Sequence, residues 1–220
     1  MIEHTYKLQL ETRQGTVTSE VEIESSNATC TVWSRFLLNK ISIGEFDGLL
    51  LNRVAVRDWG CLLENSLQCE AFLNFLRHRP REVLDILSRM RILILLNMKL
   101  KPAFRGKGIG VQILKQMIEH PAPSYSWDIA IGWARSFDGK DDNKKLNPAA
   151  AKIFKHYLKH LPNCMPWAER STFFLCDRLF RPGEIQVTNA ADYLREMTQR
   201  NSTLLAENHS GIEMKSKSRI

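Results

Sequence analysis

The sequence predicts a mixed α/β fold, of the α+β kind, in which a sheet is flanked by helices. Three observations lead to this prediction. The first forty residues alternate apolar and polar side chains, residues 91–118 read as strand, glycine-rich turn and helix, and an amphipathic helical pattern follows Asn147-Pro148. A period of two is typical of strands with one buried face, whereas apolar residues three or four apart are typical of helices that cover a sheet.

The N-terminal part predicts an antiparallel meander of three strands. The strand-like runs are Tyr6–Glu11, Val17–Ile23 and Cys30–Leu38, and turn-forming residues at 14–15 and 25–27 separate them. Glycine, serine and asparagine between such runs are typical of hairpin turns. We therefore expect consecutive strands to pair with one another.

The next segment is expected to be irregular and then helical. Residues 44–60 contain three glycines and show no clean period, so we expect no regular element there. Apolar residues recur at helical spacing over 62–76 and again over 80–90, where a proline suits the first turn. A run of aliphatic residues then predicts a buried strand at 91–100, ended by Pro102.

The second half of the chain predicts helices alternating with strands. The helix after the glycine-rich turn is expected to bury Ile109, Ile113, Leu114, Met117 and Ile118. Further elements are expected as a strand at 127–131, a polar loop at 138–145, a strand at 171–179 and a short helix at about 189–200. We expect one domain over 1–181, made of parts 1–90 and 91–181, and a C-terminal extension over 182–220 that ends in a disordered tail.

The composition is that of a soluble globular chain with an excess of positive charge. Of 220 residues, 44% are hydrophobic and 25% are charged, and the formal net charge is +7. This charge favours anionic partners, including a phosphorylated cofactor, an acidic protein or a nucleic acid, without choosing among them. Five cysteines without a Cys-x-x-Cys pair argue against a disulfide framework or a zinc site. The sequence predicts a cytoplasmic protein without a membrane partner or bound metal, because it shows neither a signal peptide nor a membrane-length apolar run.

The glycine-rich turn has the features of a phosphate-binding site. Gly106, Gly108 and Gly110 occupy alternate positions, with Arg105 and Lys107 between them and a helix directly after. Glycines let an anion approach the backbone, and the N–H groups at a helix start attract negative charge. The nucleotide P-loop is excluded because no Ser or Thr follows Gly106-Lys107, and the dinucleotide fingerprint is excluded because Val111 stands where it needs a third glycine.

The pattern that does match is Arg-x-x-Gly-x-Gly, formed by Arg105, Gly108 and Gly110. The segment Leu100–Leu114 resembles the coenzyme A-binding motif of the GNAT superfamily of N-acetyltransferases. The segment Asn147–Tyr157 resembles a later helix of that family, in which an Asn, an Ala three residues on and an aromatic residue seven residues on recur. The two blocks cover roughly residues 91–180, and the first ninety residues match loosely.

The resemblance implies a largely antiparallel sheet whose central strands splay apart to admit acetyl-coenzyme A as co-substrate. The pyrophosphate would bind the N–H groups of the turn, a backbone N–H near Leu100 would hold the thioester oxygen, and Asn147 would touch the pantetheine arm. The residues that it assigns to coenzyme A are Met98, Leu100, Arg105, Gly106, Lys107, Gly108, Ile109, Gly110, Asn147 and Phe154.

The catalytic residues that the resemblance implies are less complete. Members of the family often carry a Tyr that protonates the departing thiolate, but this chain has Phe154 at that place. Tyr157 lies three residues further and is the candidate general acid, with a core aromatic as the competing interpretation. No general base is identified, since Asn97 and Lys99 on the expected central strand are poor bases at neutral pH.

Three functions remain open on the sequence. The first is an acetyl-coenzyme A-dependent N-acetyltransferase acting by direct attack on an amine carried by a small molecule, a peptide or protein, or an aminoacyl-tRNA. The second is an inactive GNAT-like module that binds coenzyme A or a protein partner. The third, a nucleic-acid-binding protein, is suggested by the charge alone. The sequence leaves the acceptor and the oligomeric state open.

Overall fold

The computed structural model describes residues 2–25, 29–53, 58, 78–79, 81–120, 126–134, 148–167, 173–177, 189–190 and 192–196. Its strands are β1 (Ile2–Thr12), β2 (Gly15–Ser25), β3 (Thr29–Leu38), β4 (Ile41–Asn52), β5 (Arg91–Leu100), β6 (Ile129–Trp133), β7 (Cys164–Pro166) and β8 (Phe173–Asp177). Its helices are α3 (Arg81–Leu87), the 3-10 turn η2 (Pro102–Phe104), α4 (Ile109–Glu119) and α5 (Pro148–His160), and residues 192–196 are also helical. None of these helices is long and apolar enough to cross a membrane.

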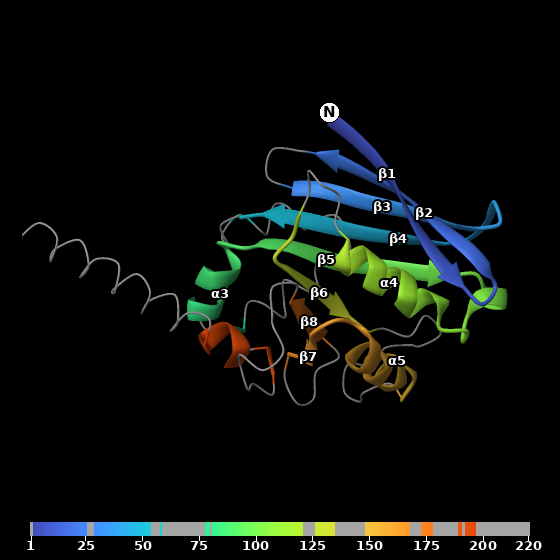
Figure 1. The fold of residues 1–220 in the computed structure, drawn as a ribbon. Coiled ribbons are helices and arrows are strands. Elements are labelled where there is room, and N and C mark those ends of the chain that lie inside the picture. Colours follow the sequence, from blue (N-terminus) through green and yellow to red (C-terminus); the bar gives the residue numbers. More distant parts are fainter. Residues whose placement is uncertain are drawn as a thin grey trace, which may run out of the picture.

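The described strands form one sheet in the order β1-β2-β3-β4-β5-β6-β8-β7. The first five strands pair antiparallel in chain order, as do β6 with β8 and β8 with β7. β5 and β6 are parallel, so the chain must cross over between them, and α4 makes that crossover. Figure 1 shows α4 lying along the sheet. The prediction of a mixed α/β fold with a largely antiparallel sheet is confirmed.

Helices lie on both faces of the sheet. One face carries α4 and α5 over a core that includes Val21, Phe36, Phe46 and Leu93. The other face carries α3 and the helical residues near Tyr193, which pack with the second core cluster of the sheet. We call these the α4 face and the α3 face. Because both faces of β5 and β6 are covered, these two strands read as continuous apolar runs rather than alternating ones.

The irregular structure expected for 44–60 is wrong over the first part of this range, because β4 extends to Asn52. Gly44 and Gly48 looked like turn residues, but each lies where a neighbour approaches the backbone closely. A Cβ on Gly48 would lie 2.8 Å from Cζ of Phe46, and one on Gly44 would collide with the carbonyl oxygen of Lys99. Glycine inside a strand is typical of such close approaches, and a register shift between Asp47 and Gly48 also broke the period.

The other predicted elements are confirmed where the structure describes them. The meander appears as β1, β2 and β3, and α3, β5, α4, β6, α5 and β8 lie at the expected places. The short strand β7 was not predicted, since three residues carry no measurable period. The helix expected over 189–200 is described as helical at 190 and 192–196. The helix expected over 62–76, the loop over 138–145 and the tail from Asn201 lie outside the described residues.

Two cysteines that are apart in sequence lie opposite each other in the sheet. Cys164 on β7 and Cys176 on β8 are directly paired, and both are free thiols. Cys176 is fully buried. Burial, and to a lesser degree the neighbouring Cys164, raises the pKa of the Cys176 thiol well above its ordinary value. Because the thiolate is the reactive form, Cys176 is held in its unreactive state at neutral pH.

We expect Cys164 to be alkylated by iodoacetamide well before Cys176 in the native protein at pH 8. Cys164 is half-buried, whereas Cys176 has neither access nor thiolate character. Peptide mapping by mass spectrometry measures both sites, and a sample in denaturant, where both should react, is the control. Equal labelling of the two thiols in the native state would contradict this pairing.

Candidate anion-binding turn and strand gap

The parallel pairing between β5 and β6 ends after four residue pairs. They are paired from Ile92 with Ile129 to Leu95 with Gly132, yet β5 continues to Leu100. Figure 1 shows the two strands diverging toward the end of the sheet where the chain leaves β5 for α4. Among the described strands none lies beside the last part of β5 on its β6 side. Within the described part of the sheet, a gap therefore opens between β5 and β6 beyond Leu95.

The gap leaves backbone donors of β5 directed toward it. The N–H of Lys101 donates to the carbonyl oxygen of Ile43 over 2.8 Å, so it points to the β4 side. Successive N–H groups of a strand point to opposite sides, so those of Leu100 and Met98 point to the β6 side. The carbonyl of Leu100 also points there, and it accepts a hydrogen bond from Nε of Arg105 over 2.8 Å.

A small cavity lies at the point where the strands diverge. It has a volume of about 20 Å³, which is room for about one water molecule. Its lining is largely apolar and is formed by Ile94, Leu95, Leu96, Ile131, Gly132, Trp133 and Phe173. The rings of Trp133 and Phe173 are stacked, with their centroids 5.3 Å apart. Trp133 lines this cavity and is half-buried.

The turn after β5 has the backbone conformation that its glycines suggested. Gly106 and Gly108 have φ values of +71° and +75°, which L side chains adopt at a cost. A Cβ at either position would lie in open space, with nothing within 4 Å. The turn is thus open to an incoming group, and glycine is required there by backbone conformation rather than by crowding.

The N–H groups of this turn are free to bind an anion. The last N–H groups used before it belong to Phe104 and Arg105, which donate to the carbonyls of Lys101 and Pro102. The next N–H used is that of Gln112, which donates to Gly108 in the first turn of α4. Within the described residues, no partner is found for the N–H groups from Gly106 to Val111. Unpaired N–H groups at a helix start, reinforced by the helix dipole, form an anion-binding site.

The charged side chains of the turn stay at the surface. Arg105 and Lys107 are exposed; Arg105 caps the end of β5 as described, and Nζ of Lys107 lies 5.6 Å from the ring centre of Phe104. Both cations therefore belong to the turn and contact the residues just before it. Gly110 has a different role, because a Cβ there would lie 3.2 Å from Cδ1 of Leu100 and 3.5 Å from Cε of Met98. It lets the first turn of α4 pack tightly on the end of β5.

The structure places Phe154 and Tyr157 on the same side of α5, against the core of the α4 face. The ring of Tyr157 meets that of Phe174 edge to face, with centroids 5.3 Å apart. The ring of Phe174 in turn packs against Gly132, which lines the cavity. Tyr157 thus reaches the strand gap through Phe174 and does not itself line the cavity. Burial raises the pKa of its hydroxyl, so the hydroxyl keeps its proton throughout the neutral range.

The polar side of α5 faces away from the sheet as expected. Its exposed residues are Lys152, Lys155, His156, Lys159 and His160. The rings of His156 and His160 lie 4.5 Å apart. Burial, followed by these neighbouring histidine and lysine charges, lowers the pKa of His156. No group of three potential metal ligands is found among the described residues. Asn147, assigned to the cofactor by resemblance, lies outside the described residues.

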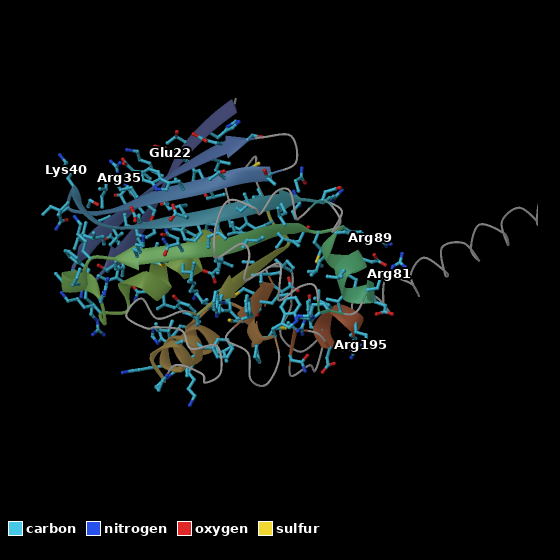
Figure 2. The ribbon with its side chains drawn as sticks, turned by 180° about the vertical axis from the view of Figure 1, so that it is seen from behind. Glu22, Arg35, Lys40, Arg81, Arg89 and Arg195 are labelled. Atoms are coloured by element: carbon cyan, nitrogen blue, oxygen red, sulfur yellow. The ribbon has the colours of Figure 1, made fainter. Side chains whose placement is uncertain are left out.

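Several other cations are distant from the turn. Arg81 and Arg89 in and after α3 lie with Arg195 at one end of the molecule, and Figure 2 shows them at the end opposite to the turn. The excess positive charge is therefore distributed over several surfaces rather than gathered in one stripe. Such a distribution gives no particular support to a nucleic-acid interface.

Sequence analysis did not predict two features of β5 beside the gap, which are the bulge at Leu96 and the hydrogen-bond partner of Asn97. Leu96 is the extra residue of a bulge, since Asn97 pairs with Asp47 while Leu95 pairs with Gly48. Nδ2 of Asn97 donates to Oδ2 of Asp47 over 3.2 Å. Asn97 was noted as polar, but its partner lies fifty residues earlier in a segment expected to be irregular. No signal in the sequence connects the two.

Comparison with known proteins gives no family for the chain. No protein-family model matches it, and no curated protein is significantly similar to it in sequence.

Proposed function

We propose that the chain is an acetyl-coenzyme A-dependent N-acetyltransferase of the GNAT type. The observation that carries this proposal is that the end of β5, the gap beside it and the turn into α4 directly adjoin one another. β5 runs past the end of its pairing with β6, directs the N–H groups of Met98 and Leu100 into the gap, and leads into a turn with unpaired N–H groups at the start of α4. A long ligand with an anionic end and a thioester end matches both sets of donors.

The two sets of donors would hold different parts of acetyl-coenzyme A. The N–H groups from Gly106 to Val111 would bind the pyrophosphate, with the charges of Arg105 and Lys107 beside it. The thioester carbonyl would accept a hydrogen bond from the N–H of Leu100 or Met98. That donor would bind more strongly to the negative oxygen that develops during attack than to the neutral carbonyl, which is how such a site accelerates acyl transfer.

The reaction would proceed by direct attack in a ternary complex. The neutral amine nitrogen forms a bond to the carbonyl carbon, and the carbon–sulfur bond breaks as the tetrahedral intermediate collapses. The nitrogen loses a proton and the departing thiolate gains one, so that the products are an N-acetylated amine and coenzyme A. Tyr157, whose hydroxyl keeps its proton at neutral pH, is our candidate for the proton donor.

A second function has one observation in its favour. Phe154 replaces the usual Tyr, and Tyr157 packs its ring on Phe174 in the core instead of lining the cavity. A module that binds coenzyme A without turnover would need the turn but no proton donor. Activity measurements separate this function from catalysis, whereas binding measurements do not.

The test of the proposal combines binding with turnover. Calorimetric titration with acetyl-coenzyme A and with coenzyme A measures affinity, and thiol release measures transfer to a panel of amines, peptides and aminoacyl-tRNAs. The proposal expects both binding and thiol release that depends on one class of acceptor. Binding without release on any acceptor would favour the module, and the absence of binding would overturn both functions.

Replacing Gly108 with valine should weaken coenzyme A binding by roughly 100-fold or more. The side chain would fill the open space over the N–H groups, and a β-branched residue is disfavoured at this φ. Calorimetry measures the affinity. Gly15→Ala is the control, because Gly15 also has a positive φ but lies in the hairpin between β1 and β2. Unchanged affinity in Gly108→Val would show that the turn does not bind the pyrophosphate.

Replacing Tyr157 with phenylalanine should lower kcat by roughly 10- to 100-fold and leave coenzyme A affinity unchanged. The protonated hydroxyl is the active form, and burial raises its pKa, so the wild-type rate should not fall from loss of this proton until the pH exceeds about 10. Rate–pH profiles of both proteins provide the measurement. Phe154→Tyr is an informative companion, since it restores the usual residue. A Tyr157→Phe profile that overlays the wild type would exclude Tyr157 as the acid.

A further inference from the structure

The α3 face of the first five strands carries two neighbouring rows of polar side chains that differ in charge. The first row alternates in sign across the sheet and consists of Lys7, Glu20, Arg35, Glu45 and Lys99, each directly paired with the next. Nζ of Lys7 lies 2.8 Å from Oε1 of Glu20, and Nζ of Lys99 lies 3.8 Å from Oε1 of Glu45. The bond from Lys7, and more weakly Arg35, lowers the pKa of Glu20. Every acid in this row has a cationic neighbour.

The second row contains two acids, an aromatic residue and an amide, and it contains no cation. It consists of Glu22, Trp33, Asp47 and Asn97, again paired strand by strand. Figure 2 shows Glu22 and Arg35 on this part of the sheet. Asp47 accepts a hydrogen bond from the amide of Asn97, and within the described residues it has no ion pair. A neutral amide orients a carboxylate but leaves its charge uncompensated.

Arg35 and Lys99 are the two nearest cations by register, and each lies directly opposite Glu45. Arg35 lies two residues along β3 from the partner of Asp47, directly opposite Glu45 and Glu20. Its guanidinium carbon is 5.2 Å from the ring centre of Trp33. The half-buried Asp47 therefore has the amide of Asn97 on one neighbouring strand and, on the other, the ring of Trp33, over which the guanidinium of Arg35 lies. A carboxylate beside an aromatic ring is a favourable environment for an ammonium group.

Asp47 lies one strand away from the gap, on β4, which borders β5 on the side opposite to β6. Its partner Asn97 directly follows Leu96, which lines the cavity between β5 and β6. The N–H of Met98, next along the strand, points into the same gap. An amine held at Asp47 would thus reach the apolar cavity and the donors proposed for the thioester by extending across β5 at Asn97.

We propose that Asp47, oriented by Asn97, binds the ammonium group of the acceptor, and that the acceptor is a primary amine carried on an apolar group. This inference rests on the proposed function for its chemical meaning. The carboxylate of Asp47 binds the protonated amine, and the ammonium loses one proton to solvent. The neutral nitrogen then attacks the thioester as described above. Asp47 selects cationic amines, and the apolar lining near Leu96 and Trp133 selects the adjoining group.

The experiment compares a cationic probe with a neutral one of the same shape. Benzylamine and benzyl alcohol are titrated separately into the wild-type protein, with and without coenzyme A, and binding is followed by NMR chemical-shift changes. We expect the wild type to bind benzylamine roughly tenfold or more tightly than benzyl alcohol. Asp47→Asn should remove this preference while leaving benzyl alcohol binding unchanged.

Glu45→Gln is the matched control. Glu45 is an acid on the same strand and face, but it is paired with Lys99 and Arg35 rather than with an amide. This variant should keep the preference for benzylamine, and unchanged thermal melting of both variants excludes a folding effect. A preference that persists in Asp47→Asn, or that disappears equally in Glu45→Gln, would overturn the assignment of the ammonium site to Asp47.

The outcomes separate this inference from the proposed function. In one outcome, coenzyme A binding depends on Gly108 but amine binding is unchanged in Asp47→Asn. This outcome would support the proposed function and overturn the assignment of the acceptor site to Asp47. Amine binding that depends on Asp47 in a protein that does not bind coenzyme A would keep the site and overturn the function. With an active enzyme, Asp47→Asn should raise KM for the amine and leave KM for acetyl-coenzyme A unchanged.

Discussion

The gap between β5 and β6 is the constraint on which the candidate site depends. A parallel pair within an otherwise antiparallel sheet requires a crossover, and the crossover here is a single helix. β5 continues beyond its pairing with β6 because β4 supports it on the other side up to Leu100. The chain can then turn and start α4 only beyond this end. The parallel pairing of β5 with β6 and its helical crossover thus place the unpaired N–H groups of β5, the positive-φ turn and the start of α4 next to one another.

The same choice explains the tight packing at Gly110. Because α4 begins immediately after the turn and folds back along the sheet, its first residues must pass close to the end of β5. Gly110 permits this approach to Leu100 and Met98, whereas Gly106 and Gly108 serve the backbone conformation of the turn. Three glycines with regular spacing therefore satisfy two unrelated physical requirements. Sequence spacing alone does not distinguish them, but the φ values and the neighbouring atoms do.

Sequence reasoning succeeded where the information is local. The turn and α4 were predicted because the glycines, the cations and the helical period all lie within fifteen residues. β4 was mistaken because Gly44 and Gly48 accommodate close neighbours on β5 that are distant in sequence, and the bulge at Leu96 then shifted the register. The contact of Asp47 with Asn97 and the pairing of Cys164 with Cys176 depend on strand register. Register is fixed by the whole hydrophobic pattern of a sheet, so single residues give no local sign of it.

The size of the cavity bears on how two ligands would meet across the sheet. The proposed coenzyme A turn belongs to the connection from β5 into α4, whereas Asp47 and Trp33 project from the α3 face. The interruption between β5 and β6 gives groups on opposite faces a place to come within bonding distance. A cavity of about 20 Å³ has room for a group the size of a water molecule. In the proposed complex the ammonium group would lie at Asp47, so only a small part of the apolar substituent could enter this cavity and the rest would lie against its lining residues Trp133 and Phe173.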